Sequence, residues 1–422
     1  MSESLKTMMA QRATSVAFKP PDLETIARAG GRRIRRRRAF ATLATVAAVA
    51  LAGSGVALLV DGDGSDGRPP TVAGSPWPLD AVSWSVDDTI YVGATETIDV
   101  GHVVCAYVRT SVGFVTLDET DTVYSVTEEG VTAIGELTPT LPNNQDQQRL
   151  ASDPAGSLVG WVGEPTPGVL ALQVHDQATG ETRTYPIPDA SPPNDAVFYA
   201  IDHRTGYLRM TTGLYAIDLD TGSQRQLLAS EDLEIRDMIY DHEIYSVESG
   251  VLAFSPNADQ TILAGRSIED AIELYEPGDA VPGLQVLGQA SNGMIDPVRL
   301  SPDGAWLSFG VVELDQSSEE PDAEPVFTRF VPAVFDVAAG QPVPLSIPGD
   351  PLIALPSVWL DDDTLQVLVV LGGDPQQAQL PTSVNFYECS PLDGLCDLAV
   401  EAEAPWPDEI VVPSPDGRWY GP

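Results

Sequence analysis

The stretch Leu300-Ser-Pro-Asp-Gly-Ala-Trp-Leu-Ser-Phe309 decides the fold, because a tight turn within it joins two short β-rich runs. In such a turn the Ser and Asp oxygens bond nearby backbone groups, Pro fixes φ, and Gly supplies a positive φ. Related stretches recur at Val412-Pro-Ser-Pro-Asp-Gly-Arg-Trp-Tyr420, Phe254-Ser-Pro-Asn-Ala-Asp-Gln-Thr-Ile-Leu263, Trp359-Leu-Asp-Asp-Asp-Thr-Leu-Gln-Val367 and Ala151-Ser-Asp-Pro-Ala-Gly-Ser-Leu-Val159. This recurrence predicts a repeat protein built from β-hairpins.

A second recurring element is a strand that ends in an acidic residue and a Gly-containing turn. It occurs at Leu172-Gln-Val-His-Asp-Gln-Ala-Thr-Gly180, Leu214-Tyr-Ala-Ile-Asp-Leu-Asp-Thr-Gly222 and Ala333-Val-Phe-Asp-Val-Ala-Ala-Gly340. A short fourth strand comes next, as in 341–347. Four antiparallel strands in every repeat are the pattern of β-propeller blades.

The strand-like runs can be laid out in fours to give six complete blades. These are at about 103–138, 149–187, 196–228, 251–288, 296–348 and 356–402. Two runs remain near each end, at 89–93, 97–100, 409–412 and 418–420. Together they would complete a seventh blade, which would pair the chain ends and remove an open sheet edge. We expect seven blades, with six and eight as alternatives.

The Ser-Pro-Asp-Gly turns at 301–304 and 414–417, each followed by an aromatic strand, resemble those of the TolB-like, WD-repeat-like bacterial β-propellers. The strand Tyr-Ala-Ile-Asp-Leu-Asp-Thr-Gly at 215–222 belongs to the same pattern. The resemblance covers roughly residues 80–422. It implies an all-β propeller fold and no particular activity.

Charge divides the chain into two unlike parts. The 422 residues carry a formal charge of −40, and 43% of them are hydrophobic, which excludes wholesale disorder. Residues 1–38 hold ten basic and three acidic residues, a net charge of about +7. The remainder has a net charge of −47 and contains no Lys. A domain this acidic would repel nucleic-acid phosphates, which excludes nucleic-acid binding through residues 39–422.

Residues 39–60, AFATLATVAAVALAGSGVALLV, form an uncharged stretch of 22 residues. As a helix it would be roughly 33 Å long, enough to cross a hydrocarbon core of about 30 Å. Arg residues crowd positions 32–38, directly before the stretch, so the positive-inside rule places the N-terminus in the cytoplasm. We therefore predict a single-pass membrane protein whose C-terminal part is extracytoplasmic. A cleaved signal peptide ending near Ala50-Leu51-Ala52 is the alternative.

The expected domains follow from these boundaries. Residues 1–38 form a basic cytoplasmic tail, 39–60 the transmembrane helix, 61–78 a Gly/Asp/Pro linker and 79–422 the propeller. Within the tail, 22–34 could form a short amphipathic helix that binds a cytoplasmic regulator. The alternative is that the basic tail lies on anionic lipid headgroups.

The three cysteines are Cys105, Cys389 and Cys396. Pro391 and Gly394 favour a hairpin between the last two, so we expect a Cys389–Cys396 disulfide, which fits an oxidising exterior. Cys105 is expected to be a small buried apolar residue.

The sequence contains no recognisable catalytic or metal-binding motif. His102, His175, His203 and His242 are scattered, without the spacing of a metal site. No Gly-x-Ser-x-Gly elbow or phosphate loop is present. The carboxylates 361–363 are expected to serve a turn. We predict no catalytic residue, no cofactor and no metal, with a Ca²⁺ ion in a central channel as a remote alternative.

Two other residue groups have expected roles. Five tryptophans lie near the repeated turns, where they are expected to pack between blades: Trp84, Trp161, Trp306, Trp359 and Trp419. Residues 229–250 and the acidic stretch 315–325 exceed what blade connections need, and we expect them to be irregular surface loops.

These features together predict a monomeric, membrane-anchored propeller that binds or senses a protein, peptide or cell-envelope ligand without catalysis. A propeller hydrolase or lyase with its site at the central channel is the alternative from another class. A transmembrane regulator whose tail recruits a cytoplasmic factor is a third reading, compatible with the first.

Overall fold

The computed structural model describes residues 77–138, 150–187, 196–210, 212–229, 243–255, 261–265, 285–289, 298–315, 326–349, 351, 353–371, 383–402 and 410–413. The chain divides into two compact units, Met1–Pro70 and Thr71–Pro422, and the described residues all belong to the second. The predicted tail 1–38, its helix 22–34, the span 39–60 and nearly all of the linker 61–78 lie outside them. Among the described residues, no helix is both long and apolar enough to cross a membrane.

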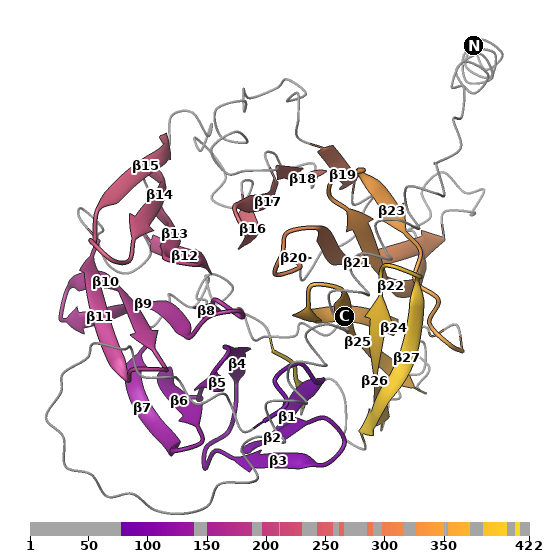
Figure 1. Ribbon diagram of the computed structural model, residues 1–422, viewed down its shortest axis with the longest axis horizontal. Helices are drawn as coiled ribbons and strands as arrows, with labels where there is room; N and C mark the ends of the chain where they lie inside the picture. The colour runs from indigo at the N-terminus through magenta and orange to yellow at the C-terminus, as the bar shows by residue number, and fades with distance from the viewer. Residues whose placement is uncertain are drawn as a thin grey trace, which may run out of the picture. The chain divides into compact units, whose positions relative to one another are not determined.

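The regular secondary structure of the described residues is β-strand throughout, as the sequence predicts (Figure 1). Four sheets each contain four consecutive antiparallel strands. The first comprises β4 (Ala106–Arg109), β5 (Phe114–Leu117), β6 (Thr122–Thr127) and β7 (Gly130–Glu136). The second comprises β8 (Ala151–Ser152), β9 (Leu158–Thr166), β10 (Val169–Asp176) and β11 (Glu181–Pro186).

The next two sheets continue the pattern. One comprises β12 (Ala196–Asp202), β13 (Thr205–Met210), β14 (Gly213–Asp218) and β15 (Gln224–Ala229). The other comprises β16 (Glu243–Glu248), β17 (Val251–Ser255), β18 (Thr261–Gly265) and β19 (Gln285–Gln289).

A larger sheet consists of two antiparallel four-strand groups. The first group is β20 (Arg299–Leu300), β21 (Trp306–Asp315), β22 (Val326–Asp336) and β23 (Gln341–Val343). The second is β24 (Ile353–Asp361), β25 (Thr364–Leu371), β26 (Ser383–Ser390) and β27 (Leu395–Ala402). A parallel pair, Phe330 with Ile353, joins them. A second parallel bridge, between Ser346 and Leu395, and a shared apolar cluster also connect the groups, so the sheet resembles two neighbouring blades packed on each other.

The remaining sheet unites the two ends of the described chain. Its strand order is β28 (Ile410–Val411), β1 (Ser83–Val86), β2 (Thr89–Val92) and β3 (Glu96–Asp99). Ser85 faces Val411, and Val86 faces Ile410.

The sequence-based composition of this sheet, two strands from each end, is wrong in detail. Three of its strands come from the N-terminal side, and 418–420 lies outside the described residues. Strand β1 was overlooked although its residues Ser83-Trp84-Ser85-Val86 alternate between polar and apolar, because a run of four residues gives only a weak periodic signal.

The fourth predicted blade is also misplaced at its start. We expected it to begin at Val251 and 229–250 to be irregular, whereas β16 occupies Glu243–Glu248 and is the first strand of that sheet. The stretch Phe254–Leu263 therefore joins the second and third strands, and not the first and second. The first hairpin uses Ser249-Gly250 instead, with φ of 49° and 76°, which suits a two-residue turn. The acidic stretch 315–325 lies outside the described residues apart from Asp315, which ends β21.

The Ser-Pro-Asp-Gly turn forms as its residues predict. The Ser301 Oγ accepts a hydrogen bond from the Trp306 amide (3.0 Å), and the Asp303 carboxylate accepts one from the Ala305 amide (3.0 Å). Gly304 has a φ of 67°, and a Cβ there would lie 2.9 Å from the Glu248 carbonyl oxygen. Glycine is therefore needed both for the turn and for its contact with the neighbouring sheet.

The acid-and-glycine turns adopt one conformation in all three copies. Asp176, Asp218 and Asp336 each end a third strand, and each side chain accepts hydrogen bonds from amides two or three residues later. Gly180, Gly222 and Gly340 close these turns with φ of 70°, 71° and 63°. The acid-and-glycine pattern that recurs in the sequence therefore corresponds to the same turn geometry in each copy.

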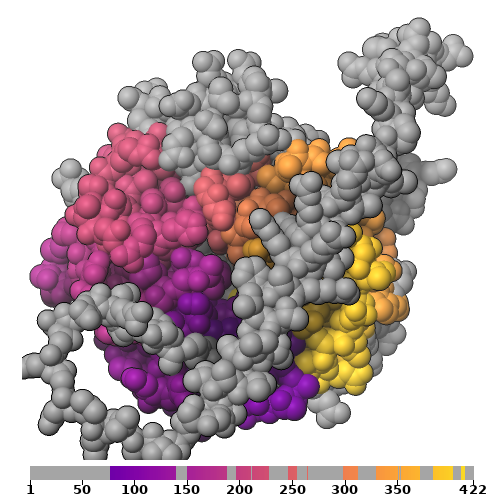
Figure 2. All heavy atoms as spheres, in the orientation of Figure 1, coloured from indigo at the N-terminus to yellow at the C-terminus, as the bar shows by residue number. Residues whose placement is uncertain are grey.

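Clusters of buried apolar side chains connect each four-strand group to the next in chain order. One cluster, for example, joins β8–β11 to β12–β14, and the next joins β12–β14 to β16 and β17. A further cluster joins β24–β27 to β1 and β28, so the last group packs on the first. In Figure 2 the yellow atoms of the last group lie beside the indigo atoms of the first.

Four of the five tryptophans fall within the described residues, and they lie between groups as predicted. Trp84 stacks on Phe386 with ring centroids 4.8 Å apart. The Trp359 Nε1 donates to the Arg299 carbonyl (3.2 Å), and the Trp306 Nε1 donates to the Asp363 carboxylate (3.4 Å). Trp161 is fully buried between β4–β7 and β8–β9. Trp419 lies outside the described residues.

Two buried glutamines connect neighbouring groups through hydrogen bonds. The Gln366 Oε1 accepts from the Ser83 amide (3.0 Å), and its Nε2 donates to the Ser83 carbonyl (3.0 Å). The Gln177 Nε2 donates to the Phe114 carbonyl (2.8 Å) and the Ser125 hydroxyl (2.9 Å). Each side-chain amide therefore forms two hydrogen bonds with the adjacent sheet.

A disulfide joins Cys389 of β26 to Cys396 of β27, which face each other in the strand register. Gly394 in the connecting turn has a φ of 73°, and a Cβ there would lie 2.6 Å from the Pro344 carbonyl oxygen. Both cysteines are buried, whereas Cys105 is only partly buried, contrary to expectation.

We predict that the purified full chain, denatured without reductant and treated with iodoacetamide, takes up a single label, at Cys105. After reduction it should take up three, because Cys389 and Cys396 become thiols. Intact-mass spectrometry measures both results. Three labels without reductant would contradict the pairing.

Candidate functional site

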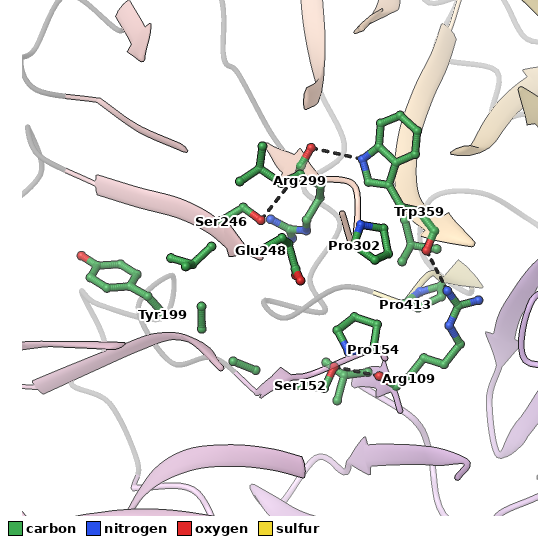
Figure 3. Close-up of a pocket in the computed structure, with 16 residues that line it drawn as sticks. Arg109, Ser152, Pro154, Tyr199, Ser246, Glu248, Arg299, Pro302, Trp359 and Pro413 are labelled. Carbon is green, nitrogen blue, oxygen red and sulfur yellow. Dashed lines mark hydrogen bonds between the residues drawn. The ribbon is translucent and has the colours of Figure 1, made fainter. Parts of the chain in front are cut away.

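A cavity lies where the first strands of several four-strand groups end (Figure 3). It has about 670 Å³ of empty space, including the part open to solvent. Residues of β4, β8, β12, β16, β20 and β24 line it, together with Pro413, which follows β28. Sheets far apart in the sequence therefore build one site.

The repeated turns contribute directly to the cavity wall. Pro154, Pro302 and Pro413 belong to three copies of the repeated stretch, and all three line the cavity. The feature that identifies the fold in the sequence thus also marks this end of the strands. Val108, Ala200, Val247, Leu300 and Val358 make most of the remaining wall apolar.

Arg109 is the most deeply buried charged residue of the cavity wall, with 5% of its surface exposed. Its guanidinium donates to the carbonyls of Trp359 (2.7 Å), Leu360 (3.2 Å) and Leu79. Burial lowers the pKa of Arg109 to about 10. Its donors are thus directed at backbone carbonyls of the last group and of the segment before β1, which gives Arg109 a structural role.

Three carboxyl groups from three consecutive groups gather beside the cavity. Asp153 follows β8, Asp202 ends β12, and Glu248 ends β16. The Asp153 carboxylate accepts from the amides of Ala155 (3.1 Å) and Gly156 (3.0 Å). The Asp202 carboxylate accepts from the amides of Ser249 (3.1 Å) and Gly250 (2.7 Å). Both aspartates are therefore engaged in holding turns.

Glu248 differs from the two aspartates, because no hydrogen bond reaches its carboxyl group from any residue that the structure describes. The group faces the cavity in Figure 3, and Arg299 lies nearby on the same wall. Burial raises the pKa of Glu248 well above its usual range, and the charges of Asp153 and Asp202 add to this effect against the opposing charge of Arg299. Burial likewise raises the pKa of Asp153.

The structure does not bring the predicted histidines together. The His102 ring stacks on Tyr124 with centroids 4.0 Å apart and pairs with Thr116, while His175 pairs with Thr182 on its own sheet. Burial lowers the pKa of both. The ring of His203 is exposed, and its Nε2 lies 3.8 Å from the Asp202 Oδ1. His242 lies outside the described residues.

The carboxylates at 361–363 have the turn role expected of them. The Asp361 carboxylate accepts from the Asp363 amide (2.8 Å). In the part of the chain that the structure describes, no three His, Cys, Asp or Glu side chains are placed to hold a metal ion. The calcium alternative therefore has no ligand set within that part.

Arg109, Glu248 and Arg299 were not identified from the sequence. The signal for them is positional, because each lies at or next to the last residue of the first strand of its group, just before a turn. Charged residues are abundant in this chain, so only the position of the turns could have singled these out.

We predict that Glu248→Gln raises the melting temperature near neutral pH by roughly 2 °C or more and has no effect at about pH 4. Burial in the folded state raises the pKa of Glu248, so the free energy of unfolding of the protein falls as the pH rises through the folded-state pKa. The neutral side chain of Gln avoids this loss. Thermal unfolding followed by circular dichroism at both pH values measures this.

Glu401→Gln, at an exposed position on β27, is the matched control and should leave the melting temperature unchanged. An unchanged or lower melting temperature for Glu248→Gln near neutral pH would contradict the raised pKa.

No protein-family model matches the chain, and no curated protein matches it in sequence. Solved structures similar to it include a putative TolB from Agrobacterium tumefaciens, with 13% identity, coverage of 80% of this chain and 95% of that one, and a TM-score of 0.34. Sqt1 from Saccharomyces cerevisiae has 12% identity, coverage of 82% and 93%, and a TM-score of 0.42. AztD from Citrobacter koseri has 12% identity, coverage of 78% and 96%, and a TM-score of 0.37. With every TM-score below 0.5, these similarities indicate nothing about function.

Proposed function

We propose that this protein is a membrane-anchored, extracytoplasmic binding module whose ligand enters the cavity at the ends of the first strands. The observation that carries the proposal is the construction of that cavity from six different first strands. A largely apolar recess with a few placed polar groups is the usual form of a ligand site. Hydrogen bonds between neighbouring sheets hold Arg109 and Ser246 of the cavity wall in place. The cavity is therefore formed before a ligand binds.

The scaffold in this proposal is a closed propeller of seven blades. The four-strand groups, the two parallel bridges within the larger sheet and the pairing of β28 with β1 support that number. The apolar cluster between the last and first groups supports closure. A rigid closed scaffold suits recognition, because little conformational entropy is lost when a ligand binds a preformed site.

The proposed location is the outer side of a cell membrane. The uncharged stretch 39–60 and the Arg-rich segment before it support an anchor with a cytoplasmic N-terminus. The disulfide fits an oxidising exterior. Recruitment of a cytoplasmic factor by residues 1–38 would be compatible with binding outside.

The enzymatic alternative requires a histidine beside carboxylates at the cavity. Of the three described histidines, His203 is the one found near the acids of this site, at 3.8 Å from Asp202. Its side chain is 72% exposed, and Asp202 already accepts two backbone amides. Within the described part of the chain, no hydrogen bond links the His203 ring to a hydroxyl group such as that of Ser246, so binding is the better-supported function.

The test is photo-cross-linking of the full chain in its native membrane. A benzophenone amino acid at exposed Ser249, in the turn after β16, should form a discrete cross-linked product because the ligand or partner reaches this end of the strands. The same probe at Val169, which is 47% exposed at the start of β10 and pairs with Thr166 at the far end of β9, is the matched control. Equal products at both positions, or none at Ser249, would contradict a binding role for the cavity.

A further inference from the structure

Three exposed leucines lie close together in the last four-strand group. Among the described residues six large apolar side chains are exposed, and three of them fall within seven positions: Leu392, Leu395 and Leu398, at 58%, 57% and 47%. The other three are isolated valines far apart in the sequence. The first leucine lies in the turn after β26, and the other two lie on β27. Single exposed apolar residues are normal, whereas a group of them marks an interaction site.

The hairpin that carries the leucines is held in a fixed shape. The Cys389–Cys396 disulfide joins its two strands. The Ser346 amide donates to the Gly394 carbonyl in its turn (2.7 Å). Because the hairpin is already ordered, little conformational entropy would be lost when a partner binds it.

Strand β27 is also the edge of its sheet (Figure 1). With eight residues, it is the longest outer strand among those described. Another segment reaches only its start, where Ser346 bridges Leu395. From Cys396 to Ala402, no strand in the described part of the chain pairs with the outer edge. The N–H and C=O groups of such an edge can accept a further strand.

The two faces of β27 differ in chemistry, because side chains alternate along a strand. Leu398 lies on the same face as the buried Cys396. Leu395 and Asp397 lie on the opposite face, where Asp397 is directly across from Glu388 of β26. Like charges placed in this way repel each other. An added strand with an apolar side chain beside Leu398 and a basic one beside Asp397 would bury the leucine and offset the repulsion.

The surrounding charge distinguishes between the possible partners. Residues 330–417 contain 14 acidic residues and no Lys, Arg or His. A second copy of the chain would therefore bring carboxylates against carboxylates. The hydrocarbon of a membrane would have to accept Asp393, Asp397 and unpaired backbone groups, which lipid cannot satisfy. A basic, extended protein segment supplies both the opposite charge and the missing hydrogen bonds.

We propose that β27 binds an extended segment of a partner protein in which apolar and basic side chains alternate, as a further strand on the edge of the sheet. The surface lies on an outer strand, whereas the cavity lies at the ends of the first strands. The proposal therefore goes beyond the proposed function, and either of the two can fail without the other.

The test is calorimetric titration of the full chain in detergent micelles at about 150 mM salt, which screens general attraction to the acidic domain. The probe is acetyl-Lys-Val-Lys-Val-Lys-Val-Lys-amide. Two control peptides carry the same charge: one has Ser in place of each Val, and the other is N-methylated at its five central residues. We expect the probe to bind saturably and both controls to bind about tenfold more weakly or less, because they lose apolar contacts or strand hydrogen bonds.

Variants locate the site. Leu395→Thr combined with Leu398→Thr should weaken probe binding about tenfold or more, because less apolar surface is buried. Asp397→Asn should weaken it about threefold, as expected for an exposed ion pair. Val169→Thr and Glu96→Gln, at exposed positions in other groups, are the matched controls and should leave the affinity unchanged. All of these side chains are exposed, so every variant should still melt cooperatively.

Amide hydrogen exchange shows where the probe binds. The probe should slow exchange in β27 and leave the outer strand β11 unchanged, because new backbone hydrogen bonds form along one edge only. Equal binding of either control peptide, equal affinity in the leucine double variant, or equal protection of β11 would overturn the proposal. Protection of β27 in phosphatidylcholine nanodiscs without the probe would also overturn it, because the leucines would then belong to the membrane surface.

Discussion

The pairing of β28 with β1 is the constraint on which the rest of the structure depends. These strands are more than 300 residues apart in the sequence, and joining them costs loop-closure entropy, which grows only slowly with length. Gln366 holds Ser83 beside them through two hydrogen bonds, and Trp84 stacks on Phe386 across the same boundary. Without this junction, the edge of β1 would lose its partner strand and could pair with other chains. The cavity would also lose the wall at Pro413.

Buried polar contacts between sheets accompany apolar packing throughout the described part of the chain. Gln177, Gln366, Arg109 and Asp202 each satisfy backbone groups of a different four-strand group. Apolar faces tolerate small sliding movements, but a side-chain amide that must meet both the N–H and the C=O of one residue does not. These contacts therefore fix the relative position of neighbouring sheets, and with it the shape of the cavity that the sheets share.

Much of the fold was predictable from the sequence because it is encoded in local turn chemistry. Ser301, Asp176 and Gly304 act within a few residues of their own positions, so their pattern is readable without knowledge of the fold. Strand β1 was not predicted, since a run of four residues with only two apolar positions gives a weak periodic signal. The register of the fourth group was misread because its first hairpin uses the two residues Ser249-Gly250 in place of the five-residue repeat turn. The site was missed for a different reason: the pKa of Glu248 is raised first by burial and then by the charges of Asp153 and Asp202, which lie in other sheets, and no spacing along the chain records these surroundings.

The proposed closure of the domain depends on the pairing of β28 with β1, two strands from opposite ends of the described chain. The most direct test is amide hydrogen exchange of the native full chain, read by mass spectrometry on peptides that cover β1, β25 and β28. Closure predicts that β1 and β28 exchange as slowly as β25, because they open only when the whole domain unfolds. Rapid exchange of β1 and β28 while β25 stays protected would show that the ends are not joined and would contradict the account.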